Sequence, residues 1–171
     1  MEFKDIIQKR RSVRVFTAEP VSDEKLRRVL EAARLAPSTK NCQAWKFVVV
    51  KDSNKRKALT QAANNQVFID QAPIIIVAVA LMPDTIMPCG VPSYAVDLAI
   101  AMEHVVLAAV DEGLGTCWIG AFSQENVRRV MGIPDKYKVV TVMPMGYPAG
   151  ETAARLRKPI EEVMCYEKFT E

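Results

Sequence analysis

Three arginines and one serine near the start of the chain are the residues best suited to chemistry. In KRRSVRVF, Arg10, Arg11 and Arg14 surround Ser12. A guanidinium binds phosphate through two parallel charge-assisted hydrogen bonds, and a nearby hydroxyl can add a third. The cluster therefore predicts a phosphate site. Spacing alone favours the alternative, a solvated basic helix end that complements the helix dipole.

A second basic cluster occurs far along the chain, in ARLRKP. It contains Arg155, Arg157 and Lys158. Two such clusters could converge on one phosphate, and the sequence alone leaves open whether they do.

Two polar segments could face the edge of a polar ring. PSTKNCQAW offers the hydroxyls and amides of Ser38, Thr39, Asn41 and Gln43 between a helix end and a strand start. Asn64–Gln66 precedes an apolar stretch. The alternatives are ordinary turn chemistry for the first segment and a helix end for the second.

Other familiar catalytic patterns are missing. The single histidine, His104, has no identifiable nucleophile beside it, which favours a packed or interface residue over a general base. The cysteines at positions 42, 89, 117 and 165 match no zinc spacing, so we expect free thiols and no metal site.

The glycine-rich segment GLGTCWIG does not predict a dinucleotide fold. It follows a helical pattern and precedes a strand, which is the reverse of a Rossmann turn. No Walker loop is present either. Any nucleotide must therefore be held in another way.

Composition predicts one soluble domain over residues 1–171. Half of the residues are apolar and a quarter are charged. The N-terminus lacks a signal-peptide pattern, and the longest apolar run, 72–82, is too short to span a bilayer. We therefore expect a cytoplasmic protein with no membrane partner.

Charge is distributed unevenly along the chain. Residues 1–60 hold 15 Lys and Arg against 7 Asp and Glu, whereas residues 61–171 hold 8 against 13. No nucleic-acid-binding motif accompanies the basic third, so we expect no nucleic-acid partner. A smaller anionic ligand needs less positive charge than a duplex does.

Helical and extended patterns alternate, which predicts an α/β or α+β layered domain. We expect helices near 3–10, 23–36, 54–64, 94–112 and 124–131, and strands near 47–50, 74–81, 116–120, 138–148 and 162–169. Ser22 is the expected cap of the second helix. Pro144 predicts a bulge or a sheet edge in the strand that contains it.

Two segments need separate mention. The long helix is apolar on nearly every side, which predicts that it is buried all round and shared with a second subunit. The preceding segment PDTIMPCGVPS has three prolines and one glycine, which indicates a loop and a candidate mobile lid.

Taken together, these segments resemble the nitroreductase family of flavin-dependent NAD(P)H oxidoreductases, in its compact form. The resemblance covers essentially the whole chain in order: KRRSVRVF, LAPSTKNCQAWKFVVV, AANNQVFIDQAPIIIVA, the helix leading to GLGTCWIGAF, MGYP and RLRKPIEEVMCYEKF.

The resemblance implies an α+β, three-layer αβα fold with a mixed, mainly antiparallel sheet flanked by helices. It implies an obligate homodimer with FMN at the interface. It also implies that an arm of about residues 160–171 crosses to the partner and adds a strand to its sheet.

The family pattern assigns two groups of residues to the phosphate end. The resemblance implies that one group binds the phosphate, the ribityl chain and part of the ring edge of FMN. This group is Arg10, Arg11, Ser12 and Arg14. The phosphate grip is completed by Arg155 and Arg157.

The ring end is assigned in the same way. Asn65 is implied to bond the pyrimidine edge, and the Gly120–Ala121 backbone to face the flavin N5. The second subunit would close the site with Pro37, Ser38, Thr39 and Asn41.

This sequence departs from the family pattern in two places. Ala44 replaces the usual proline, and Val67 and Phe68 follow Gln66 where larger relatives carry a lysine. Arg14 would then supply the positive charge near the flavin N1 and O2.

The implied function is hydride transfer from NADH or NADPH through flavin N5 to a small acceptor such as a nitroaromatic, quinone or enone, by a ping-pong mechanism. Two alternatives stay open. One is a flavin-binding redox sensor or flavin-handling protein with little turnover, in which Cys42 could take part. The other is a nucleic-acid-binding domain that uses the basic N-terminus.

Overall fold

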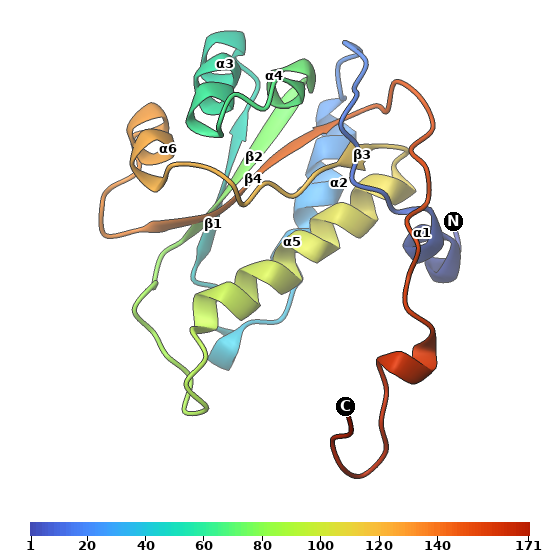
Figure 1. Ribbon diagram of the computed structural model, residues 1–171. Helices are drawn as coiled ribbons and strands as arrows, with labels where there is room; N and C mark the ends of the chain where they lie inside the picture. The colour runs from blue at the N-terminus through green and yellow to red at the C-terminus, as the bar shows by residue number, and fades with distance from the viewer.

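The computed structural model describes all 171 residues. It contains six α-helices, two short 3₁₀ helices and four strands (Figure 1). The helices are α1 (Phe3–Lys9), α2 (Asp23–Arg34), α3 (Ser53–Ala62), α4 (Phe68–Gln71), α5 (Ser93–Asp111) and α6 (Gln124–Met131). The 3₁₀ helices are Thr39–Asn41 and Ile160–Glu162. The strands are β1 (Trp45–Val50), β2 (Ile74–Ala80), β3 (Gly115–Thr116) and β4 (Lys138–Gly146).

One sheet with the order β1-β2-β4-β3 organises the molecule, and its strand pairs are antiparallel. Every residue of β2 is buried. Ile74 and Ile76 face one apolar cluster, whereas Ile75 and Val77 face another. Because successive side chains of a strand point to opposite faces, both faces of β2 must be covered.

Helices supply that cover from both sides. The first cluster contains Val29 from α2 and Leu98 from α5. The second contains Leu59 from α3, Ile69 from α4 and Val127 from α6. The result is a layer of helices on each face of the sheet (Figure 1). The predicted three-layer α+β fold with a mainly antiparallel sheet is confirmed.

Helix caps lie close to their predicted positions. The Ser22 hydroxyl accepts a hydrogen bond from the Lys25 N–H at 3.3 Å and caps α2 as expected. Helix α6 has the predicted bounds and ends at Gly132, whose φ of 64° is the left-handed value that favours glycine at this position.

The arginine-bearing segment after α1 lies along the short strand β3. Ser12 forms an isolated parallel bridge with Thr116, and the Val13 N–H donates to the Thr116 carbonyl at 2.9 Å. Phe16 forms a second bridge with Pro148. This segment is extended, and it brings Arg10–Arg14 to the β3 edge of the sheet.

Two strand predictions need correction. The strand predicted at 116–120 is only the pair Gly115–Thr116, followed by a single bridge at Ile119, because β4 is the only strand beside it. Pro144 does not make β4 an edge strand, and the bulge of β4 is not at Pro144 but at Val140, which lies between Val139, paired with Val79, and Thr141, paired with Ala78. Pro144 is tolerated where the ladder with β3 has ended.

Within one chain, helix α5 is buried on one face, and its predicted burial all round, which involves a second subunit, stays a prediction. Leu98, Met102 and Val105 lie in the core, whereas Ala99 and Glu103 are exposed. This helix is long and apolar enough to cross a membrane by length and composition, and it packs here against α2 and the sheet.

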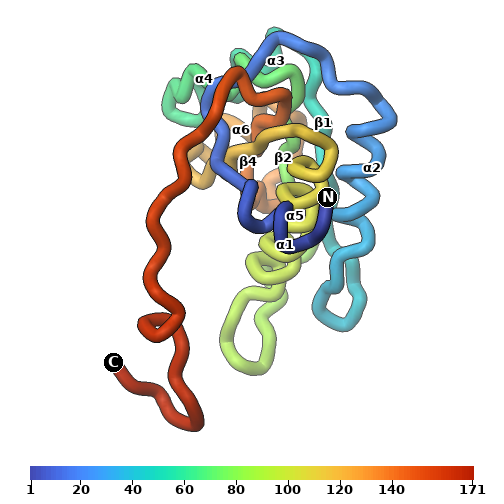
Figure 2. Tube along the Cα trace, turned by 90° about the vertical axis from the view of Figure 1, so that its right-hand side faces the viewer, coloured from blue at the N-terminus to red at the C-terminus, as the bar shows by residue number.

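The C-terminal tail extends away from the body of the molecule (Figure 2). Residues 150–171 are exposed, and they form a 3₁₀ turn at Ile160–Glu162 in place of the strand predicted near 162–169. No sheet edge of the same chain lies against the tail to pair with it. The predicted exchange of this arm between subunits stays a prediction.

The two-sided core gives the first test. Leu59 is 0% exposed and Leu35 is 64% exposed. We expect Leu59→Ala to lower the free energy of unfolding by about 2–5 kcal/mol, because it leaves a cavity under the sheet. The control, Leu35→Ala, should change it by about 0.5 kcal/mol or less. Urea unfolding of both variants measures this, and equal losses would contradict the assigned core.

Candidate functional site

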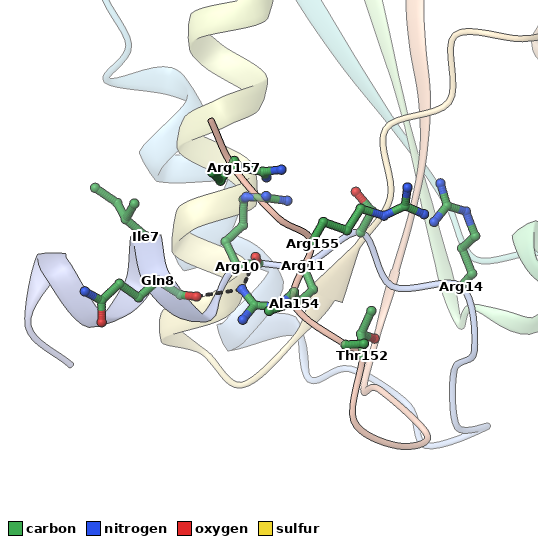
Figure 3. A pocket seen from close by; sticks show the side chains of 11 residues that line it. Ile7, Gln8, Arg10, Arg11, Arg14, Thr152, Ala154, Arg155 and Arg157 are labelled. Atoms are coloured by element: carbon green, nitrogen blue, oxygen red, sulfur yellow. Dashed lines mark hydrogen bonds between the residues drawn. The ribbon is translucent and has the colours of Figure 1, made fainter. Parts of the chain in front are cut away.

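The two basic clusters of the sequence line one pocket (Figure 3). The pocket has a volume of about 560 Å³. One wall is the N-terminal segment with Arg10, Arg11, Ser12 and Arg14. The other wall is the start of the C-terminal tail, and its residues are Thr152, Ala153, Ala154, Arg155 and Arg157. The structure therefore brings together residues that are more than half the chain apart.

None of the five arginines of this pocket forms a salt bridge. Arg11 donates through Nη1 to the carbonyls of Gln8 at 2.6 Å and Arg10 at 2.9 Å, which fixes its side chain without neutralising its charge. Burial raises the pKa of the nearby Glu103 carboxyl, and the Arg10 guanidinium opposes that rise. The pocket thus carries a concentration of uncompensated positive charge.

Arg14 lies between this pocket and a second group of predicted residues. Its guanidinium lies 5.9 Å from the centre of the Phe68 ring, within the range of a cation–π contact. Burial raises the pKa of the Cys117 thiol, and the Arg14 guanidinium acts in the opposite direction. Arg14 therefore lies between the anionic pocket, α4 and the segment that follows β3.

The Asn64–Gln66 turn contacts the segment after β3. The Asn64 and Gln66 side-chain amides both donate to the Ala121 carbonyl, at 3.4 and 3.3 Å. Asn64 and Asn65 have φ values of 58° and 56°, a left-handed conformation that asparagine tolerates better than most residues. The Asn65 N–H donates to the Thr60 carbonyl, and its side chain makes no hydrogen bond within the chain.

The backbone at Gly120 and Ala121 offers free donors. Neither N–H donates a hydrogen bond to any group of the chain, and both residues are exposed. The Ala121 carbonyl is held by the Asn64–Gln66 turn, so this short segment is fixed while its N–H groups stay available. Such preoriented donors can stabilise developing negative charge on a ligand.

The loop Pro37–Asn41 lies away from the arginine pocket. The Thr39 N–H and hydroxyl donate to Asp97 Oδ1, at 2.9 and 3.0 Å, near the start of α5. The basic N-terminal segment lies beside Val110, near the end of α5. At a rise of about 1.5 Å per residue, Asp97 and Val110 are roughly 20 Å apart along the helix. Within one chain, these two groups of predicted residues do not meet.

Comparison with known proteins gives the family. The model of the nitroreductase family matches residues 7–81 and 62–147. The chain belongs to the nitroreductase family. The predicted family is confirmed, and with it the predicted class of enzyme, an NAD(P)H-dependent oxidoreductase of nitroreductase type.

Relatives of nitroreductase type align over most of the chain. A nitroreductase family protein from Clostridium novyi NT is 38% identical, with a TM-score of 0.83 and 86% of both chains covered. An FMN-dependent nitroreductase from Clostridium difficile R20291 is 30% identical, with a TM-score of 0.84 and coverage of 96% of this chain and 98% of that one. An FMN reductase (NAD(P)H) from Bacillus subtilis is 31% identical and covers 93% of this chain and 71% of its own length.

Several residues around the candidate site were missed from the sequence. Thr152–Ala154 line the arginine pocket but carry no distinctive chemical group. Phe68 lies beneath the Arg14 guanidinium, and its place three residues after Asn65 was the available signal. His104 is a packed residue as predicted, because its Nδ1 lies 3.0 Å from the Ala32 carbonyl.

The position of the arginine segment can be tested through Gly115. A Cβ at this residue would lie 2.5 Å from Val13 Cγ2. We expect Gly115→Ala to displace the segment and lower the free energy of unfolding by about 1–3 kcal/mol through overpacking. The control is Gly150→Ala, where a Cβ meets nothing within 4 Å. Urea unfolding measures both, and an unchanged midpoint for Gly115→Ala would show that this contact is not tight.

Proposed function

We propose that this nitroreductase-family protein binds FMN, with the phosphate held in the arginine pocket, and transfers hydride equivalents from NADH or NADPH to a small organic acceptor. The observation that carries the proposal is the convergence of five arginines without carboxylate partners on one pocket.

Charge supports a phosphate in this pocket. A phosphate monoester carries about −1.5 to −2 charges near pH 7 and offers three strong acceptor oxygens. Guanidinium groups match those oxygens through paired hydrogen bonds, and the Ser12 hydroxyl adds one more donor to the same wall. The residues present therefore fit the phosphate end of FMN.

Three features support the assignment of the ring end. Arg14 reaches from the pocket to α4, where its guanidinium supplies positive charge. The Asn65 side chain is free to bond the pyrimidine edge of the ring. The free N–H groups of Gly120 and Ala121 are available to donate near N5.

When bound, FMN supplies a ring that takes hydride from NAD(P)H and passes electrons to an acceptor such as a nitroaromatic, quinone or enone, one substrate leaving before the next enters. The protein then needs no acid–base dyad. Its residues bind, orient and stabilise charge: the arginines hold the phosphate, and the backbone donors face the ring.

A second copy of the chain would complete the site. Pro37–Asn41 lies about 20 Å from the same chain's arginines along α5, so its predicted contact with flavin requires the partner subunit. The outer face of α5 offers an apolar surface for the partner, with Ala95, Ala99 and Ile100. The tail carries exposed Leu156, Tyr166 and Phe169, which are suited to bury against another chain.

Removing arginine charge tests the phosphate assignment. We expect Arg10→Ala with Arg14→Ala to weaken FMN binding about a hundredfold or more, because charge-assisted hydrogen bonds contribute about 1.5–3 kcal/mol each. Fluorescence titration of apoprotein with FMN measures the affinity. A dimer that FMN stabilises should also dissociate more readily in this variant.

The matched control removes the same charge elsewhere. Arg27 and Arg129 are exposed on α2 and α6. Arg27→Ala with Arg129→Ala should retain FMN. Full FMN retention by the Arg10 and Arg14 variant would overturn the phosphate assignment.

Turnover separates an enzyme from a flavin-binding sensor. We expect purified protein to show flavin absorbance, to be bleached anaerobically by NADH or NADPH, and to be reoxidised by a quinone or a nitroaromatic compound. Bleaching without reoxidation by any acceptor would indicate the sensor. Colourless protein that cannot be reconstituted with FMN would sink both flavin functions.

A further inference from the structure

The aromatic ring of Phe68 supports one arginine of the pocket, Arg14. The Arg14 guanidinium carbon lies 5.9 Å from the centre of this ring. Arg14 is exposed and forms no salt bridge or side-chain hydrogen bond, whereas Arg11 is fixed by two backbone carbonyls. In Figure 3, Arg14 lies at the opposite end of the pocket from helix α1. The face of the Phe68 ring is therefore the contact that orders the Arg14 charge.

Phe68 is a firm support because it packs against two parts of the core. Its ring is partly buried against the small cluster of Val13, Phe16 and Ala72. It also packs against the larger cluster on the face of the sheet that α3, α4 and α6 cover. Val13 and Phe16 flank Arg14 in the sequence. One side chain of α4 thus holds both the backbone of the arginine segment and its guanidinium.

The charge of Arg14 is not cancelled by the thiol near it. Burial raises the pKa of the Cys117 thiol above its usual value, so this thiol is neutral near pH 7. The Arg14 guanidinium opposes that rise, so its charge acts on the segment that leads to Gly120 and Ala121. Arg14 therefore keeps its full positive charge between α4 and the free backbone donors of that segment.

A fixed charge at this place distinguishes the two redox states of a flavin. This step rests on the proposed function, which places the ring beside Arg14, Asn65 and the Gly120–Ala121 backbone. Hydride addition at N5 converts a neutral ring into one that carries a single negative charge shared by N1 and O2. A guanidinium beside that charge attracts the reduced ring more strongly than the oxidised ring.

We propose that Phe68 is a positioning residue that orders Arg14 beside the flavin ring, and that the ordered charge makes this protein bind reduced FMN more tightly than oxidised FMN. An arginine without support must be ordered when the ligand binds, whereas contact with the Phe68 ring orders it beforehand. A flavin that binds more tightly once reduced stays in the protein until an acceptor arrives. It then acts as a bound cofactor, not as a reduced product that is released.

The test measures how strongly the protein prefers reduced flavin. The redox preference is the dissociation constant of oxidised FMN divided by that of reduced FMN, each obtained by anaerobic titration of apoprotein. A tenfold change in this ratio shifts the two-electron reduction potential of bound flavin by about 30 mV. Phe68→Leu keeps an apolar side chain in the core but removes the ring face. Phe68→Tyr keeps the ring face and is the conservative rescue.

We expect Phe68→Leu to lower the redox preference about threefold to tenfold, the range that a cation–π contact supplies. Phe68→Tyr should restore the wild-type value. The matched control is Phe47→Leu, because Phe47 is a partly buried ring that packs against the cluster on the other face of the sheet. It should leave the redox preference unchanged. An unchanged value in Phe68→Leu would overturn the role of Phe68.

A double-mutant cycle separates positioning of Arg14 from a merely structural role of Phe68. Arg14→Gln removes the charge and keeps a polar side chain of intermediate length. In that background Phe68→Leu should not change the redox preference further, because the charge through which Phe68 acts is gone. Equal effects of Phe68→Leu with and without Arg14 would show that Phe68 acts by another route, which contradicts the proposal.

A fluorinated ring keeps the test decisive if Phe68→Leu folds poorly. Replacement of Phe68 by a trifluorophenylalanine nearly preserves the shape of the ring and weakens its negative face. It should lower the redox preference in the same direction, and no change would overturn the proposal. Failure of the wild-type protein to bind either form of FMN would contradict the proposed function itself. A redox preference that is independent of Phe68 contradicts only the inference made from the Arg14 contact, so the two failures are distinguishable.

Discussion

The burial of β2 on both faces is the constraint from which the rest of the architecture follows. Seven consecutive residues with almost no exposed surface require a layer of helices on each side. With the faces covered and β1 at one edge, the short β3 leaves the other edge free. The Ser12–Thr116 bridge occupies that edge and positions the arginines there. The candidate site therefore lies at the margin of the sheet, where backbone donors remain exposed.

Much of this architecture could be predicted from the sequence, because helices, strands and helix caps depend on local sequence patterns. The alternation of helices and strands, the Ser22 cap and the buried run in β2 follow from periodicity and capping chemistry. The strand at 116–120 was predicted too long because extended propensity does not show how much partner strand is available. The strand predicted in the tail stays a prediction, since the sheet edge that it was expected to join belongs to a second subunit.

The candidate site, like the fold, could be predicted from the sequence only in part. Arg10 and Arg155 were predicted to bind an anion, but their convergence on one pocket is a long-range property that spacing does not encode. The free N–H groups of Gly120 and Ala121 were inferred from family resemblance, since backbone donors have no sequence signature. Asp97 was missed because an acidic residue in an apolar helix reads as a solvent-facing position. The structure shows its role, because Asp97 accepts two hydrogen bonds from Thr39 and so fixes the Pro37–Asn41 loop.

The two ends of α5 connect these observations. Near its C-terminal end lie five like charges, whose mutual repulsion favours a bound anion. Near its N-terminal end the Pro37–Asn41 loop is held to α5 by the Thr39 hydrogen bonds to Asp97. In the proposed function both of these regions contact one flavin, which a rigid helix of this length prevents within one chain. In the proposed dimer the start of one α5 would lie beside the end of another, and the half-exposed apolar face between the two ends would be covered by the same contact that completes the site.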